Sequence, residues 1–173
     1  MTEGLKLEMV RADMNKFKLG KKVDFAYIMM GSIMYTKNNE LFLSHLDSVA
    51  DSLRSGGLYL VENLTMNWSD PKFLKSQSWT MRKNGTKVRT IYRITPKDPL
   101  KQIVSQSIVL EVDDNGEKKK FTDQMDLKVV FPEEFKLLIE KNGKFEFIGF
   151  FEREKVKLLK NISSNNIALL RRR

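Results

Sequence analysis

The stretch "HLDSVADSLRSGGLYLVENL", residues 45–64, decides the fold. It carries apolar residues at helical spacing into two glycines, and then into an apolar run that ends on an acid. Apolar residues three and four positions apart indicate the buried face of a helix, and a short apolar run after a turn is typical of a buried strand. Gly56 and Gly57 can adopt the left-handed backbone that closes a helix. The stretch therefore predicts a helix, a glycine turn and a strand, in that order.

A second apolar run precedes this stretch. Residues 23–35, "VDFAYIMMGSIMY", are almost continuously apolar as far as Met30, which is typical of a strand buried on both faces of a parallel sheet. Asn38 or Asn39 can cap the helix that follows. Strand, helix and strand in this order predict a right-handed βαβ unit. Alternating apolar and polar residues over 5–12 predict a further short strand before it.

The second half of the chain changes character. Residues 76–130 hold several strand-like segments separated by turn signals such as Asn84-Gly85, so we expect an antiparallel β layer inserted into an α/β domain. Residues 131–173 begin with a helix signalled by a proline in its first turn and a glycine after its last. Two closing strands follow, and their short polar connection favours an antiparallel pair. We therefore expect one domain, with the βαβ unit in residues 1–75.

Composition limits the function. The chain has no cysteine and a single histidine, which excludes disulfides and the usual zinc sites, so we expect no metal and a cytoplasmic location. His45 lies beside the apolar stripe of its helix, where a packing role is favoured over catalysis. No apolar run approaches the roughly 20 residues that span a bilayer. The net charge of +9 admits nucleic acid as a partner, but lysines interspersed with glutamates favour a solvated surface.

The order of five segments carries a family resemblance. The segments are "RADM" at 11–14, the runs at 23–35 and 45–64, "FPEEFKLLIEKNGKFEFIGFFE" at 131–152 and "NNIALLRRR" at 165–173. Together they resemble the class I S-adenosylmethionine-dependent methyltransferases, and in particular the small-molecule group that includes the amino-sugar N,N-dimethyltransferases. The resemblance covers nearly all of the 173 residues. It implies a Rossmann-like α/β sheet, S-adenosylmethionine as cofactor and a small-molecule acceptor.

The same resemblance implies which residues bind the cofactor. "ADM" matches the family's adenine-edge motif, which implies that Asp13 accepts a hydrogen bond from the adenine amino group and that Met14 packs on the ring. Met30 and Gly31 match the wall between cofactor and acceptor, at the end of a strand where open α/β sheets bind ligands. The alternatives are structural: Asp13 caps a turn, and the methionines are core residues.

The resemblance also implies which residues bind the methyl acceptor: Ser32, Tyr35, Glu62, Asn63 and Trp68. Tyr35 could position an amine or hydroxyl, or pack. Glu62 and Asn63 could bind the acceptor or supply a base, or anchor a loop. Trp68 could form the floor of a substrate pocket or pack against a hairpin. No catalytic triad is expected, because methyl transfer from a sulfonium needs alignment rather than a covalent intermediate.

A glycine-rich loop that is typical of the family is missing from these residues. The family binds the cofactor's methionine portion on a GxGxG loop after its first strand, and no such loop occurs here. We therefore expect a methyltransferase sheet without its first βα units, as in a fragment. A non-catalytic or degenerate subunit and an RNA-directed methyltransferase or basic binding module are the alternatives. Such a sheet would expose an apolar edge, which predicts a homo-oligomer or poor solubility.

Overall fold

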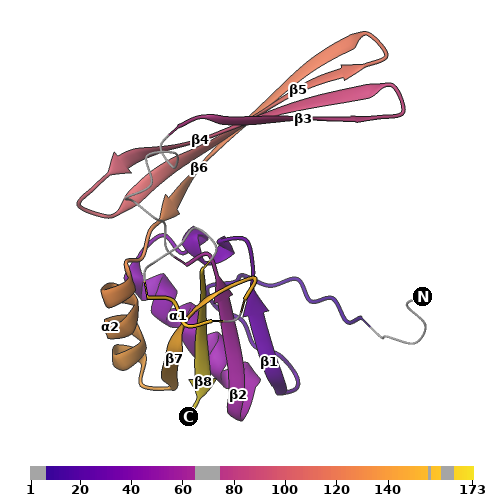
Figure 1. The fold of residues 1–173 in the computed structure, drawn as a ribbon. Helices are drawn as coiled ribbons and strands as arrows, with labels where there is room; N and C mark the ends of the chain where they lie inside the picture. The colour runs from indigo at the N-terminus through magenta and orange to yellow at the C-terminus, as the bar shows by residue number, and fades with distance from the viewer. Residues whose placement is uncertain (1–6, 65–74, 156, 161–165) are drawn as a thin grey trace.

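The computed structural model describes residues 7–64, 75–155, 157–160 and 166–173. The chain forms two four-stranded sheets (Figure 1). In chain order the elements are β1 (Val23–Ile28), the 3-10 helix η1 (Ser32–Tyr35), α1 (Asn39–Ser52), β2 (Leu53–Glu62), β3 (Gln77–Lys83), β4 (Thr86–Asp98), β5 (Ile103–Asp114), β6 (Glu117–Lys128), α2 (Pro132–Asn142), β7 (Phe145–Glu152) and β8 (Asn166–Arg172).

The first sheet is mixed, with the strand order β1-β2-β8-β7. Strands β1 and β2 are parallel and flank α1 in the chain, which confirms the βαβ unit, and β8 is antiparallel to both β2 and β7. Both helices pack on one face of this sheet. His45 of α1 hydrogen-bonds to Tyr59 of β2, and Phe135 of α2 contacts Phe147 and Phe150 of β7.

The turn between α1 and β2 differs from the prediction. The N-cap is Asn38, whose side chain accepts a hydrogen bond from the backbone N–H of Leu41 at 2.8 Å. The helix already ends at Ser52, so Gly56 and Gly57 do not close it. Gly56 has a φ of 77° but lies within β2, where the pairing with β1 shifts register. The glycines thus form a bulge in the strand, because the helix passes directly into extended backbone.

Two predictions about the amino-terminal half are wrong. Residues 7–12 form no strand. Strand β1 is not buried on both faces, because Phe25 is 49% and Tyr27 62% exposed. It lies at the edge of the mixed sheet, and the helices described above cover only the opposite face. An apolar run shows that a strand exists, but burial of its two faces depends on which elements cover it.

The second sheet, formed by β3 to β6, is antiparallel, which confirms the prediction of an antiparallel β layer. Its strand order is β3-β4-β5-β6, and it extends away from the mixed sheet (Figure 1), so we call it the blade. Asn84 and Gly85, with φ values of 49° and 81°, form the tight turn between β3 and β4. At the base of the blade, Ile94 and Leu127 are buried in the hydrophobic core. No helix in the described part of the chain is long and apolar enough to span a membrane.

Candidate functional site

The loop after β1 lies beside the end of β2. Because the two strands are parallel, their carboxyl ends meet at one edge of the sheet, where open α/β sheets bind ligands. Three residues at this edge have left-handed backbone: Met30 (φ 55°), Gly31 (φ 70°) and Asn63 (φ 53°). Residues other than glycine rarely adopt this conformation, so surrounding contacts must hold Met30 and Asn63 in place.

Glu62 supplies those contacts. One oxygen of its carboxylate accepts a hydrogen bond from the backbone N–H of Met30 at 2.8 Å, and the other accepts one from Arg153 at 2.7 Å. Its backbone carbonyl accepts a bond from the N–H of Gly31 at 3.2 Å. The side chain is 2% exposed. Hydrogen bonds from Arg153 and then from Met30 hold the pKa of Glu62 below its usual range. An ionised, paired carboxylate is a weak base, so the geometry favours the loop-anchoring alternative over general-base catalysis.

Asn63 and Gly31 are in close contact at this edge. A Cβ placed on Gly31 would lie 3.4 Å from the carbonyl oxygen of Asn63. The backbone N–H of Asn63 donates to the carbonyl of Asn166 at 2.8 Å, but in the described part of the chain nothing donates to its buried Oδ1 atom. A buried acceptor without a partner is unusual, and a ligand N–H could satisfy it.

The helix η1 connects this edge to the blade. Ser32 begins η1, and its N–H donates to the carbonyl of Met29 at 3.1 Å. Tyr35 ends η1, is partly exposed, and lies near Tyr92 of β4. Burial, with a smaller contribution from Tyr35, raises the pKa of Tyr92. The predicted acceptor residues Ser32 and Tyr35 thus lie between the two sheets. Trp68 lies outside the described residues.

Asp13 forms a tight turn. Its Oδ1 atom accepts hydrogen bonds from the backbone N–H of Asn15 at 2.8 Å and from the side chain of Asn15 at 2.9 Å. This is the capping role considered as the alternative to adenine binding. The exposed Oδ2 atom takes part in no hydrogen bond within the described ranges, so the carboxylate keeps one oxygen for a ligand.

His45 holds this turn on α1. Its Nδ1 atom lies 2.7 Å from the carbonyl oxygen of Met14, and its Nε2 atom 2.7 Å from the hydroxyl of Tyr59. A carbonyl can only accept, so Nδ1 carries the proton and Nε2 accepts from the tyrosine. The ring is 4% exposed, and this burial lowers the pKa of His45. The sequence indicated a packing histidine but gave no signal of its two partners.

The structure brings together only some of the predicted residues. Met30, Gly31, Glu62 and Asn63 form one edge. No hydrogen bond or ion pair among the described residues joins Asp13 or Met14 to that edge; both lie on the turn held by α1. Arg153, which follows the end of β7, was not predicted. Its partner Glu62 lies 91 positions away in the chain, so no local pattern could have indicated the pair.

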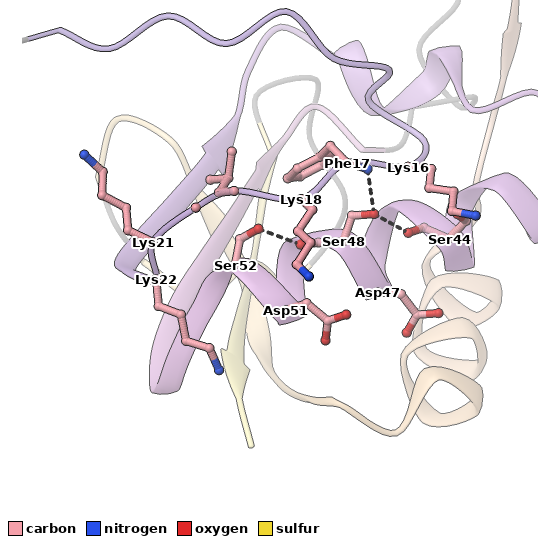
Figure 2. Close-up of a pocket in the computed structure, with 12 residues that line it drawn as sticks. Lys16, Phe17, Lys18, Lys21, Lys22, Ser44, Asp47, Ser48, Asp51 and Ser52 are labelled. Carbon is pink, nitrogen blue, oxygen red and sulfur yellow. Dashed lines mark hydrogen bonds between the residues drawn. The ribbon is translucent and has the colours of Figure 1, made fainter.

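A cleft of about 840 Å³ lies elsewhere, between residues 16–22 and α1 (Figure 2). Four lysines line it with Asp47 and Asp51, and these two acids also pair with Lys144 at 3.0 and 3.2 Å. The cleft lies near the amino end of β1, away from the strand edge described above. In the described ranges, no group of three or more histidine, cysteine, aspartate or glutamate side chains could hold a metal ion.

Comparison with solved structures relates this arrangement to known proteins. A methyltransferase from Clostridium acetobutylicum that depends on S-adenosylmethionine is 16% identical, with a TM-score of 0.77 over 98% of this chain and 66% of that one. An amino pentose methyltransferase from Micromonospora echinaspora is 16% identical, with a TM-score of 0.71 over 94% of this chain and 63% of that one. A sugar N-methyltransferase from Streptoalloteichus is 19% identical, with a TM-score of 0.72 over 94% of this chain and 61% of that one.

These similarities establish the fold. The chain spans less than two thirds of the length of each of the three structures. No protein-family model and no curated protein matches the sequence.

Proposed function

We propose that this chain, whose fold is that of the S-adenosylmethionine-dependent methyltransferases, serves methyl transfer from S-adenosylmethionine to a small-molecule acceptor. The observation that carries the proposal is the Met30–Gly31 loop, which Glu62 and Arg153 hold in a left-handed conformation at the ligand-binding edge of this fold. One structure with the same fold, the amino pentose methyltransferase, was solved with S-adenosylmethionine bound.

The residues present fit part of this cofactor. The free oxygen of Asp13 and the buried Oδ1 atom of Asn63 are acceptors that amino groups of the cofactor could satisfy. Gly31 adopts a left-handed backbone (φ 70°) at this edge, a conformation that glycine takes without the strain a side chain would cause. A glycine-rich GxGxG loop is absent from the sequence, so these residues support binding of only part of the cofactor.

The bound cofactor would supply a methyl group on a sulfonium, which needs a nucleophile held in line. The chain's own contribution is positioning. Glu62 fixes the loop, and Tyr35 offers a hydroxyl between the edge and the blade. Because Glu62 is ionised and paired, we assign it no role in proton transfer. An acceptor amine that is already neutral needs no base to activate it. We therefore favour a small amine as the acceptor, with nucleic acid as the less favoured class.

Calorimetric titration with S-adenosylmethionine tests the proposal, using the 173-residue chain and, where the reading frame extends upstream, the longer chain. Glu62→Gln should weaken binding about 10-fold, because it removes charge-assisted hydrogen bonds that hold the loop. Asp13→Ala should weaken it similarly. Asp24→Asn is the matched control, because Asp24 pairs with Arg54 on the surface near the opposite end of β1.

Transfer of a labelled methyl group then separates the alternatives. Labelling of a panel of amino sugars supports the proposal. Labelling of RNA alone would favour an RNA-directed enzyme, with affinity that falls steeply with salt. Absence of binding by either chain would overturn the proposal in favour of a non-catalytic protein with a methyltransferase fold.

A further inference from the structure

The dipeptide Asn-Gly occurs three times in the chain, at residues 84–85, 115–116 and 142–143. Asparagine is a thermolabile residue, because the backbone nitrogen of the next residue can attack its side-chain carbonyl carbon. A following glycine permits this attack most readily, since it has no Cβ to obstruct the approach and its backbone is the least restricted. The three pairs share this local chemistry, so the contacts that each makes in the fold decide how far their reactivities differ.

Asn84 and Gly85 form the turn between β3 and β4, at the end of the blade that lies farther from the mixed sheet (Figure 1). Both residues are exposed and have left-handed backbone. In the described ranges, neither the side chain of Asn84 nor the backbone N–H of Gly85 takes part in a hydrogen bond. Neither of the two reacting groups is therefore restrained by a hydrogen bond.

The pair Asn115-Gly116, in the turn between β5 and β6, is also exposed but is restrained at both reacting groups. The backbone N–H of Gly116 donates to Oδ1 of Asp113 at 3.0 Å. The side-chain amide of Asn115 donates to Oδ1 of Asp114 at 3.1 Å. Attack by the Gly116 nitrogen requires these hydrogen bonds to open first.

The pair Asn142-Gly143 ends α2 and is restrained in the same way. The backbone N–H of Gly143 donates to the helix carbonyl of Ile139 at 3.0 Å. The side chain of Asn142 donates to Asp47 at 3.0 Å and accepts the backbone N–H of Lys144 at 3.2 Å. Of the three pairs, only the one in the β3–β4 turn has both reacting groups unrestrained by hydrogen bonds within the described residues.

We propose that Asn84 is a site of spontaneous deamidation, with water as the co-reactant. The backbone nitrogen of Gly85 loses its proton and bonds to the side-chain Cγ atom of Asn84, and the Cγ–Nδ2 bond breaks to release ammonia. Water then opens the resulting succinimide at either of its carbonyls, which gives aspartate or isoaspartate. Both products carry a carboxylate, and isoaspartate also adds a methylene group to the backbone.

The isoaspartate product changes the outer end of the blade. Lys83 pairs directly with Thr86, and a two-residue turn of this kind has no place for an additional backbone atom. The neighbouring turn is in contact with this one, because the carbonyl of Gly85 accepts the backbone N–H of Asn115 at 3.4 Å. We therefore expect loss of strand pairing next to both turns, while the mixed sheet is unchanged.

Incubation of the 173-residue chain at mildly alkaline pH, followed by peptide mapping with mass spectrometry, tests the proposal. No cofactor is needed, so the outcome is independent of the methyl-transfer proposal. Asn84 should deamidate at least about 10-fold faster than Asn115 and Asn142, because the latter two must first open hydrogen bonds. In denaturant the three rates should become similar. A folded chain in which Asn84 reacts no faster than the other two would overturn the proposal.

A variant tests whether hydrogen bonds cause this selectivity. Asp113→Ala releases the backbone N–H of Gly116, so the rate at Asn115 should rise toward that at Asn84. The matched control is Asp123→Ala, because Asp123 accepts the backbone N–H of Gln124 and none from an Asn-Gly pair. It should leave all three rates unchanged. Circular dichroism establishes that both variants are folded. If Asn115 stays slow in the folded Asp113→Ala variant, hydrogen bonding does not select Asn84 and the argument for this site is overturned.

Discussion

His45 is a structural residue that joins the turn carrying Asp13 to strand β2. Its imidazole joins the carbonyl of Met14 to the hydroxyl of Tyr59 inside the core. In the neutral ring Nδ1 donates to the carbonyl of Met14 and Nε2 accepts from the hydroxyl of Tyr59, and this second bond depends on the neutral form. Protonation would turn Nε2 into a donor and bring a charge into a buried position. Burial lowers the pKa of His45, so a neutral imidazole holds the turn that carries Asp13.

This geometry predicts a pH-dependent stability. The folded-state pKa of His45 is lowered, so the unfolded chain takes up its proton first as the pH falls. The contribution of His45 is fully present above the unfolded-state value of about 6.5 and is lost as the pH falls toward the folded-state pKa. Between about pH 6.5 and pH 5.5 the loss is at most about 1.4 kcal/mol for one proton.

Urea unfolding of the wild type and of His45→Gln at a series of pH values measures this loss. The difference in unfolding free energy between the two proteins should shrink below about pH 6.5, because only the wild type has the histidine. A difference that stays constant with pH would contradict the assignment.

The sequence locates the candidate site residues better than it explains them. It places Met30 and Glu62 at the ends of neighbouring strands, because apolar runs show where strands end. It does not indicate that Arg153 donates a hydrogen bond to the carboxylate of Glu62, because that contact depends on how β7 and β8 pair within the sheet. A tertiary partner far along the chain has no periodicity to reveal it.

At the scale of elements, Glu134 joins α1, α2 and β6. Its carboxylate lies 3.2 Å from the ammonium of Lys128 and accepts bonds from the side chain of Asn39 at 3.0 Å and the backbone N–H of Phe131 at 3.4 Å. Lys128 ends β6 and is buried, with Gln102 as its further partner at 2.9 Å. The ion pair therefore joins the base of the blade to the helical layer.

We expect Glu134→Ala to lower the unfolding free energy by about 3–5 kcal/mol, because it leaves the buried ammonium of Lys128 without its counter-charge. The neighbouring Glu133→Ala is the control. Within the described ranges Glu133 pairs only with Lys136 on the surface, so its loss should cost no more than about 0.5 kcal/mol. Chemical denaturation of both variants measures the two values. Equal effects would show that the blade is joined to the helices by other contacts.

The accuracy of the sequence predictions also varies between elements. Asn-Gly turns predicted the β3–β4 hairpin because they favour the left-handed backbone that a two-residue hairpin needs. The prediction that the glycines after α1 close the helix was wrong, because the same left-handed conformation occurs at helix ends and at strand bulges. Gly57 is required by a close approach instead, since a Cβ there would lie 2.9 Å from the carbonyl oxygen of Arg54. Local chemistry indicates a backbone conformation but not the element that uses it.

The mixed sheet is covered unevenly when the whole molecule is considered. Both described helices pack on the face that carries Tyr59, while Phe25 and Tyr27 project from the other face of edge strand β1. Their rings stack with centroids 5.8 Å apart. Leu60 pairs with Tyr27 and Leu169 pairs with Leu60, so these two half-buried residues continue the apolar surface across the sheet. We call this surface the open face.

The open face predicts non-specific self-association of the chain. An exposed edge strand with large apolar side chains promotes aggregation, and a lysine placed on it opposes both edge pairing and apolar contact. Tyr27→Lys should therefore reduce the rise of light scattering with protein concentration. Thr122→Lys adds the same charge at an exposed position of the blade and separates this local effect from the effect of net charge. If the two variants reduce scattering equally, net charge governs solubility and the open face does not drive association.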